Sequence, residues 1–395
     1  MTADDPAAAP TARGPLGRLA DAVTGPVTVS IVLALVVGGI VIAIAGGDPV
    51  AAYPTMITGS LTGRGLTNTL GRAIPIVGMA LAIAFTFRAG VFNLGTEGQM
   101  VLGALAGTMV ALTVPGPGFL VILLACVAAV VAGGAWALLS AVLQTRLGVP
   151  ILISSLLLNY PARYLSSYLV RFPLRDKASS MVATRAVPDA AQIPALVPAQ
   201  SGLGRSMASG LGSDNVLVLI GRNVNWSLAV VAAIAVAVVV INGRTASGYE
   251  SGMAGFNLRF AIYGGVDTNR LALKVMFTSG GISGLIGVML ILGSQYRVID
   301  GALVGTNYAW TGLLVALLAA SRPLGVLIAG FFFAALVVGG EAMQRSADVS
   351  SQIAQVIQAA VIVLLTFRVG WAGRRRRGAA AAVSQAEADA EVGRL

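Results

Sequence analysis

Residues 88–100 read Arg-Ala-Gly-Val-Phe-Asn-Leu-Gly-Thr-Glu-Gly-Gln-Met and lie between two long apolar runs, 72–87 and 100–114. Four polar side chains fall in this glycine-interrupted break, namely Asn93, Thr96, Glu97 and Gln99. Unpaired backbone groups are costly inside a bilayer, so a break at membrane depth must be buried in protein or line a cavity. A carboxylate at that depth is a functional candidate. The stretch therefore predicts a polar element in a membrane protein that moves a solute.

The composition is typical of a membrane protein with many spans. Of 395 residues, 56% are hydrophobic and 11% are charged, and the mean hydropathy is +0.85. Soluble domains carry about 25% charged residues. The net charge of +10 is compatible with nucleic-acid binding, but many basic residues flank apolar runs or form the tail Arg374–Arg377. We therefore expect membrane lipid, and no nucleic acid, as a partner.

The residue types exclude several kinds of chemistry. The chain has no histidine and one cysteine, Cys126, so it can form neither an internal disulfide nor a Cys/His metal site. Without histidine it also lacks the usual nucleophile–base pair of an enzyme. A phosphate-binding P-loop needs Gly-Lys-Ser/Thr, and neither Lys177 nor Lys274 follows a glycine. We expect no enzymatic activity, no cofactor and no metal on this chain.

Apolar runs of about 17–25 residues can cross a bilayer as helices. We predict an all-α polytopic membrane protein with about ten transmembrane helices, one or two of which can be re-entrant. Arg13 and Arg18 precede the first run and Arg374–Arg377 follow the last, so the positive-inside rule places both termini in the cytoplasm. The runs are 27–45, 67–87, 97–114, 119–143, 149–170, 225–242, 271–293, 302–320, 323–340 and 351–369.

The polar segments divide the chain further. Residues 1–26 are predicted to be a disordered cytoplasmic N-terminus, residues 27–370 the transmembrane domain, and residues 371–395 a basic and then acidic disordered cytoplasmic tail. The run 27–45 can be interpreted as a signal peptide, but its length favours a retained helix. The external connection 171–224 is either a solvated loop or a docking surface. The cytoplasmic connection 243–270 carries apolar residues suited to contact with another protein or the membrane face.

Two polar groups within the runs have both structural and functional interpretations. Thr96-Glu97-Gly98-Gln99 fits a capping box, in which Thr96 caps the helix and Gln99 reaches back, while Glu97 complements the helix dipole. Alternatively, Glu97 takes part directly in the solute path or its gate. Asn159 and Tyr160 either hold helices together or line a path for a polar, ring-bearing solute. The residues predicted for the substrate path are Phe92, Asn93, Glu97, Gln99, Asn159 and Tyr160.

Several motifs resemble those of one protein family. Gly90–Met100 resembles the Gly-Val-Phe-Asn-Ile-Gly-x-Glu-Gly-Gln-Met signature of bacterial ABC-importer permeases for branched-chain amino acids, ribose-type sugars and nucleosides. Leu157-Leu158-Asn159-Tyr160 resembles the Met-Leu-Asn-Tyr motif of the nucleoside and simple-sugar branch. Residues 308–325 and 339–344 resemble two further motifs of that branch, and the resemblance covers residues 25–370 in order.

The resemblance implies a permease subunit of the bacterial inner membrane that forms the translocation path of an ATP-driven importer of nucleosides. Implied partners are a second, related permease, ATP-binding cassette subunits that hold ATP and Mg, and a solute-binding lipoprotein or periplasmic protein. Residues 243–270 would contain the coupling helix that docks on the ATPase. Its implied contact residues are Glu250, Gly255, Phe256, Asn257, Phe260, Ala261, Tyr263 and Gly265. The chain departs from the family at Ser251-Gly252-Met253, where Leu-Arg-Ala is common.

Other functions remain open from sequence. The solute can instead be ribose, another simple sugar or a branched-chain amino acid. An ion-coupled carrier or channel is a different class, and it is disfavoured because such carriers keep several buried carboxylates, whereas Glu97 is the only acid clearly within a predicted span. A membrane scaffold or receptor without transport is a third class.

Overall fold

The computed structural model describes residues 26–44, 46–347, 350–353, 355–360 and 363–364. In these residues every regular element is a helix, and extended segments pair only through isolated bridges. The chain divides into two compact units, Met1–Tyr53 with Met343–Leu395, and Pro54–Ala342. The predicted tail 371–395, the predicted N-terminus 1–26 except Pro26, and part of the run 351–369 lie outside the described residues.

The first unit contains α2 (Pro26–Ile44), which corresponds to the predicted run 27–45. It also contains the start of α3 (Pro49–Leu61), a helix that the sequence analysis did not predict. The Tyr53 hydroxyl donates a hydrogen bond to the Leu35 carbonyl and so ties α3 to α2. Helix α3 continues into the second unit.

The second unit holds α4 to α15 and α16 as far as Ala342. Every predicted run from 67–87 to 323–340 falls on one or two helices, and the run 271–293 ends in the short π-helix η2 (Ile291–Gln295). The run 302–320 is divided, because Asn307 adopts a φ of +55° that ends one helix before the next begins. The helices are α4 (Gly63–Arg88), α5 (Thr96–Thr113), α6 (Gly118–Leu147), α7 (Ile151–Arg171), α8 (Gly202–Leu211), α9 (Val216–Asn223), α10 (Ser227–Arg244), α11 (Ala246–Phe256), α12 (Leu258–Tyr263), α13 (Thr268–Leu290), α14 (Ala302–Gly305), α15 (Tyr308–Leu318) and α16 (Pro323–Ala347).

Five of the described helices are long and apolar enough to cross a membrane, namely α4, α6, α10, α13 and α16. Helices α5 and α7 are not among them, because polar residues in the first turn of α5 and along the middle of α7 lower their hydropathy. Most of the apolar part of α4 and α13 is buried, whereas α6 and α10 expose most of theirs. The predicted number of spans and the cytoplasmic location of both termini remain predictions.

Close helix packing at the centre of this unit depends on glycine. A Cβ atom added to Gly103 of α5 would lie 2.2 Å from the Cα of Gly284 in α13, and one added to Gly280 of α13 would lie 2.4 Å from the Gly133 carbonyl oxygen of α6. These two contacts let α5, α6 and α13 approach backbone to backbone, which is how helices associate without a hydrophobic driving force in lipid.

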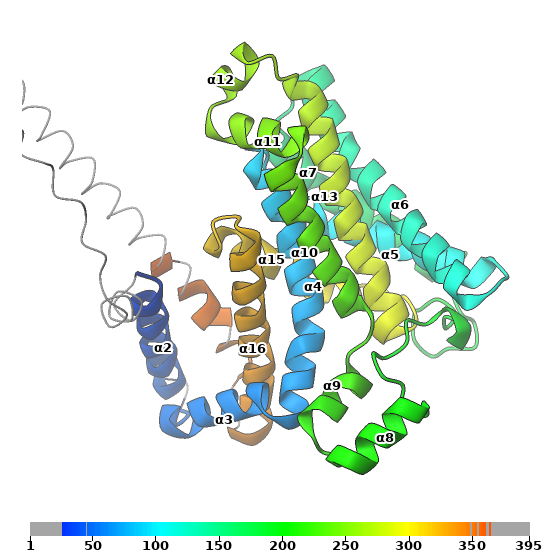
Figure 1. The fold of residues 1–395 in the computed structure, drawn as a ribbon, viewed down its shortest axis with the longest axis vertical. Coiled ribbons are helices and arrows are strands. Elements are labelled where there is room, and N and C mark those ends of the chain that lie inside the picture. Colours follow the sequence, from blue (N-terminus) through cyan, green and yellow to red (C-terminus); the bar gives the residue numbers. More distant parts are fainter. Residues whose placement is uncertain (1–25, 45, 348–349, 354, 361–362, 365–395) are drawn as a thin grey trace, which may run out of the picture. The chain divides into compact units, whose positions relative to one another are not determined.

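Short helices occupy the two ends of the second unit. Helices α8 and α9 lie near the end where α4 begins, and α11 and α12 lie near the end where α4 finishes (Figure 1). Residues 171–224, predicted as one irregular external connection, therefore include two ordered helices. The break between α4 and α5 lies toward the end of the unit that carries α11 and α12.

Candidate functional site

The break predicted from residues 88–100 is present between α4 and α5. Gly90 has a φ of +73° and turns the chain after α4, and α5 begins at Thr96. Asn93 is fully buried in this turn. Its side-chain oxygen accepts hydrogen bonds from the Gly95 amide and the Gln99 side chain, and its nitrogen donates to Gln99 and Ser279, all at 3.0 Å. Asn93 and Gln99 therefore pair side chain to side chain.

The predicted capping box is wrong. The N-cap residue of α5 is Gly95, and no side chain caps it within the turn. Gln99 does not reach back to the cap, because both ends of its amide are bonded to Asn93. Glu97 does lie in the first turn of α5, where its negative charge complements the helix dipole.

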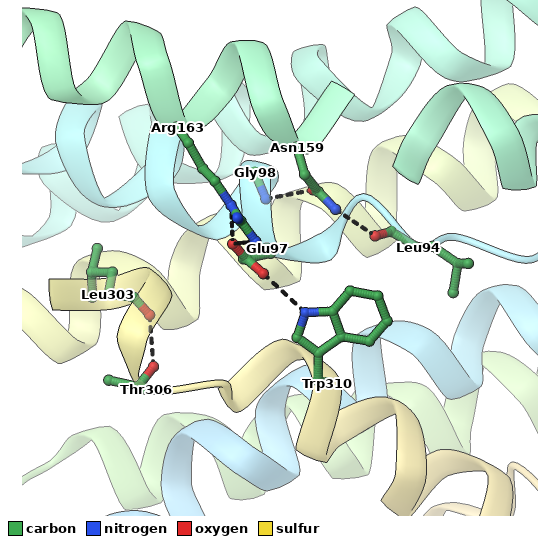
Figure 2. Close-up of polar contacts among 8 residues, drawn as sticks. All are labelled: Leu94, Glu97, Gly98, Asn159, Arg163, Leu303, Thr306 and Trp310. Carbon is green, nitrogen blue, oxygen red and sulfur yellow. Dashed lines mark hydrogen bonds and ion pairs between the residues drawn. The ribbon is translucent and has the colours of Figure 1, made fainter. Parts of the chain in front are cut away.

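Helix α7 supplies the missing cap of α5. The Asn159 oxygen accepts from the Gly98 amide at 2.8 Å, and its nitrogen donates to the Leu94 carbonyl at 2.9 Å (Figure 2). The Ser155 hydroxyl accepts from the Leu94 amide at 3.1 Å. Side chains one turn apart on α7 thus satisfy backbone groups that the helix end leaves without partners. The sequence interpretation of Asn159 as a residue that holds helices together is supported.

Glu97 is held by two residues from other helices. Its Oε1 accepts from Arg163 of α7 at 2.5 Å, and its Oε2 accepts from the Trp310 indole of α15 at 3.1 Å (Figure 2). The guanidinium of Arg163 also lies 5.6 Å from the ring centroid of Tyr160. Glu97 is 3% exposed. Its charge is therefore compensated by a cation and a neutral donor, as a buried carboxylate requires.

The predicted path residues divide into two groups. Asn93, Glu97, Gln99 and Asn159 are buried around the first turn of α5, where their hydrogen bonds and the Glu97–Arg163 ion pair form what we call the network. A cavity of about 10 Å³ lies beside Asn93, Glu97 and Trp310. That volume is about enough for one water. In contrast, Phe92 and Tyr160 lie about half exposed on the surface of this unit. The buried residues therefore hold helices together, whereas Phe92 and Tyr160 are accessible on the surface.

Sequence reasoning missed Arg163, Trp310 and Ser279 as members of the network. Arg163 had a signal, because it is a cation in the middle of the run 149–170 and lies four residues after Asn159, hence on the same helix face. A buried acid requires such a partner. Trp310 and Ser279 had no such signal in the sequence. They are distant along the chain from Glu97 and Asn93, and both residue types are ordinary in an apolar run.

A second polar group, also missed, lines a larger space. Arg72 of α4 and Glu341 of α16 form an ion pair at 2.6 Å. They border a cavity of about 390 Å³ between α4, the start of α10, the end of α13, α15 and α16. The Tyr308 hydroxyl lies beside Arg72. This volume is in the range of sites for small molecules.

Residues 243–270 fold into α11 and α12, which form an exposed surface. Phe256 and Tyr263 are 92% and 91% exposed, and Phe260 is also exposed, whereas Ala261 is buried beneath them. Asn257 caps α12 by accepting from the Phe260 amide at 3.1 Å, and Gly265 ends it with a φ of +83°. The structure thus separates the predicted coupling residues into an exposed aromatic set and a supporting set.

Two glycines of this surface approach the end of α4. A Cβ on Gly255 would lie 2.1 Å from the Arg88 carbonyl oxygen, so only glycine fits there. The Arg88 guanidinium lies beside Gly252, at 3.5 Å from where a Cβ would be. The arginine expected in the Ser251-Gly252-Met253 stretch is absent, yet α4 brings a cation to the same place. Glu250 is half-buried on α11.

Known proteins that are similar to this chain are permeases of ABC transporters. Residues 65–366 match a family model described as branched-chain amino acid transport system / permease component. The glucose ABC transporter permease protein of Haloferax volcanii is 35% identical over 360 residues, which cover 89% of this chain and 91% of that protein. The guanosine ABC transporter permease protein of Bacillus subtilis is 26% identical over 343 residues, covering 85% and 91%.

A nucleoside ABC transporter permease protein of Lactococcus lactis is 24% identical over 343 residues, covering 86% of this chain and 90% of that protein. No solved structure matches. The match to the family model and the similarity to these permeases extend over most of the chain, and the apolar helices accord with a multi-pass membrane protein. The chain belongs to the branched-chain amino acid transport system / permease component family and is a permease subunit of an ABC transporter.

Proposed function

We propose that this chain forms part of the translocation path of an ATP-driven importer. Its solute would be a neutral, hydroxylated ring compound, and a nucleoside is the first candidate. The observation that carries the proposal is the chemistry shared by the similar permeases. Their names give glucose, guanosine and nucleosides as solutes, and each of these is an uncharged ring compound with several hydroxyl groups.

A monosaccharide is the second candidate. The glucose permease of Haloferax volcanii has a higher identity, 35%, than the guanosine and nucleoside permeases. The Leu157-Leu158-Asn159-Tyr160 motif resembles a branch that includes both kinds of solute, so it favours neither. A branched-chain amino acid is a less suitable solute, because it carries two charges, whereas the solutes named for the similar permeases are uncharged.

The proposed partners follow from the exposed surfaces. The aromatic surface of α11 and α12 would dock on an ATP-binding cassette subunit that holds ATP and Mg, since large exposed apolar patches mark interaction sites. Tyr160, Tyr164 and Tyr168 are spaced four residues apart on α7 and are all exposed. We assign this face, together with Phe92, to the solute path and to contact with a second permease.

A solute-binding lipoprotein or periplasmic protein would deliver the solute on the outer side of the bacterial inner membrane. In this arrangement the permease supplies a passage with modest affinity and the binding protein supplies most of the specificity. The buried network of Asn93, Glu97, Gln99 and Asn159 would keep α5 and α7 in fixed positions beside that passage, through the bonds that join the two helices.

Uptake measurements test the proposal. Cells with and without this chain are given labelled guanosine or labelled glucose, each with an excess of the other as competitor. Loss of guanosine uptake on deletion, with no competition by glucose, establishes a nucleoside importer, and the reverse result establishes a monosaccharide importer. If neither uptake depends on the chain, the proposed solute class is wrong.

A companion measurement tests the energy source. Uptake that continues when an ionophore dissipates ion gradients, and that stops when the neighbouring ATPase is inactivated, is expected of an ATP-driven importer. Uptake that follows the ion gradient instead would move the chain to the class of ion-coupled carriers.

A further inference from the structure

We propose that the cavity bordered by Arg72 and Glu341 is a binding site for the neutral, hydroxylated solute during its passage. This inference rests on the proposed function and deepens it by locating a site. The cavity is distinct from the network around Glu97 and from the exposed tyrosine face of α7.

The charges of the cavity indicate a neutral ligand. Arg72 and Glu341 are the charged residues among those that line it, and they compensate each other at 2.6 Å. Both side chains are about one third exposed, so donor and acceptor atoms remain accessible to a ligand. Polar groups in membrane helices that face a cavity commonly mark a solute pathway. An anionic or cationic solute would unbalance this pair, whereas hydroxyl groups can both accept from Arg72 and donate to Glu341.

A hydroxyl group without a partner supports the site independently. Ser227, at the start of α10, is 2% exposed and lines the cavity, and its Oγ has no hydrogen-bond partner. Asn225 beside it is already hydrogen-bonded, because it donates to the Gly293 carbonyl at 2.7 Å and accepts from the Ser227 amide at 3.1 Å. A buried hydroxyl with no partner is uncommon and requires an explanation. The Oγ itself is shielded from water, so a solute hydroxyl group in the cavity would become that partner when the adjoining wall moves.

The remaining walls suit the faces of a sugar or nucleoside ring. Ile286, Met289 and Leu290 of α13 and Pro75 of α4 supply the apolar part of the lining. Small-molecule sites combine such an apolar lining with a few placed polar groups. Rings with hydroxylated edges and C–H faces match this division.

A second cavity provides access from the end of the unit that carries α8 and α9. It has a volume of about 430 Å³ and shares Thr67, Asn68 and Asn223 with the first. The Nε of Arg222, which lines this outer cavity, also lacks a hydrogen-bond partner. If these shared residues move apart, the two cavities would form a polar route from the surface of α9 to the Arg72–Glu341 pair.

Cysteine reporters test the site in the complete importer. In a Cys126→Ala background, which removes the single native cysteine, Ser227→Cys and Ser294→Cys are placed separately in the cavity wall. The Ser294 hydroxyl is already bonded to the Leu290 carbonyl, so this reporter removes no contact assigned to the solute. Ser140→Cys is the matched control, because Ser140 is equally buried and lacks a partner but does not line this cavity.

Membrane vesicles of both orientations are treated with a membrane-impermeant thiol reagent. Both cavity reporters should react, and the Ser140→Cys control should not. Glucose or guanosine, whichever solute is transported, should slow the reaction about tenfold at a concentration about ten times its dissociation constant. The corresponding phosphate ester, glucose 6-phosphate or guanosine 5′-monophosphate, should not slow it.

Each other result overturns the inference in a recognisable way. If neither reporter reacts in either orientation, the cavity is closed to water and is no solute site. If both react but no solute protects either, while the vesicles still take up glucose or guanosine, the site is wrong and the proposed function stands. Protection by the phosphate ester would make it an anion site. If the vesicles take up neither glucose nor guanosine, the proposed function is wrong, and the inference that rests on it is wrong with it.

Discussion

The carboxylate of Glu97 lies at the meeting point of three helices, because its two oxygens bond to Arg163 of α7 and Trp310 of α15 while its backbone belongs to α5. A buried ion pair adds little net stability, but removal of one partner leaves the other charge uncompensated. Glu97 therefore serves first to fix the mutual position of α5, α7 and α15.

Glu97→Gln should destabilise the protein. The variant keeps an oxygen for the Trp310 indole but leaves Arg163 without its counter-charge, so we expect a loss of about 2 kcal/mol in the free energy of unfolding. The double variant Glu97→Gln with Arg163→Gln should recover part of that loss. The thermal unfolding midpoint of each purified variant in detergent measures the difference. If Glu97→Gln is as stable as the wild type and its uptake is unchanged, Glu97 neither holds the helices together nor takes part in transport.

The residues of this network were partly predictable from sequence. Asn93, Glu97, Gln99 and Asn159 stand out because polar groups in apolar runs need partners. Their partners did not, because Trp310 is 213 positions from Glu97 and Ser279 is 186 positions from Asn93. The capping box was wrong because a local hydrogen bond competed with a side-chain pair that only the folded turn brings together.

At the scale of elements, the packing of α5 on α13 depends on Gly103. Gly103→Ala would place a methyl group 2.2 Å from the Gly284 Cα, so the two helices must separate. We expect a loss of about 2 kcal/mol in stability, as for other overpacked cores. Gly243→Ala is the control, because it lies in α10 with no atom within 4 Å of the added group. The control should be neutral or slightly stabilising. Equal unfolding midpoints for the two variants would contradict this packing argument.

Long helices were easier to predict than short ones. Apolar runs of sufficient length become helices because the bilayer leaves no other way to satisfy the backbone, and the described helices cover each run from 67–87 to 323–340. Helices α3, α8 and α9 were missed, because they lie in stretches whose proline, glycine and serine content indicates loops. The division between α14 and α15 rests on the left-handed conformation of Asn307, which hydropathy does not show.

The exposed surface of α11 and α12 should be needed for docking and not for folding. Phe256→Ser with Tyr263→Ser removes two aromatic rings that are more than nine-tenths exposed, so stability should stay unchanged while association with the ATP-binding subunit falls. Leu203→Ser on α8 is the matched control, since it removes an exposed apolar side chain near the opposite end of the same unit (Figure 1). Co-purification of the ATP-binding subunit with each variant measures the effect. Equal recovery with both variants would place the docking surface elsewhere.

At the scale of the whole molecule, the second unit combines three separate regions. The Glu97 network holds the central helices, the α11–α12 surface exposes the aromatic rings proposed to contact a partner, and the Arg72 cavity provides space of about 390 Å³ within the bundle. A transport subunit has to couple a distant energy source to a solute site, and α4 extends from the Arg72 cavity to Arg88 beneath α11. A change in position of α11 can therefore reach the cavity through one continuous helix.

This arrangement predicts that solute recognition and coupling can be altered separately. The double variant Arg72→Gln with Glu341→Gln keeps the cavity neutral and avoids a single unpaired charge, but it replaces charged hydrogen-bonding groups with weaker ones. We expect the KM for uptake to rise about tenfold, which corresponds to about 1.4 kcal/mol, while the ATP-binding subunit still co-purifies. The Phe256→Ser, Tyr263→Ser variant should instead lower the maximal rate and leave the KM nearly unchanged. If the Arg72 double variant lowers only the maximal rate, the ion pair belongs to the moving parts of the importer and does not contact the solute.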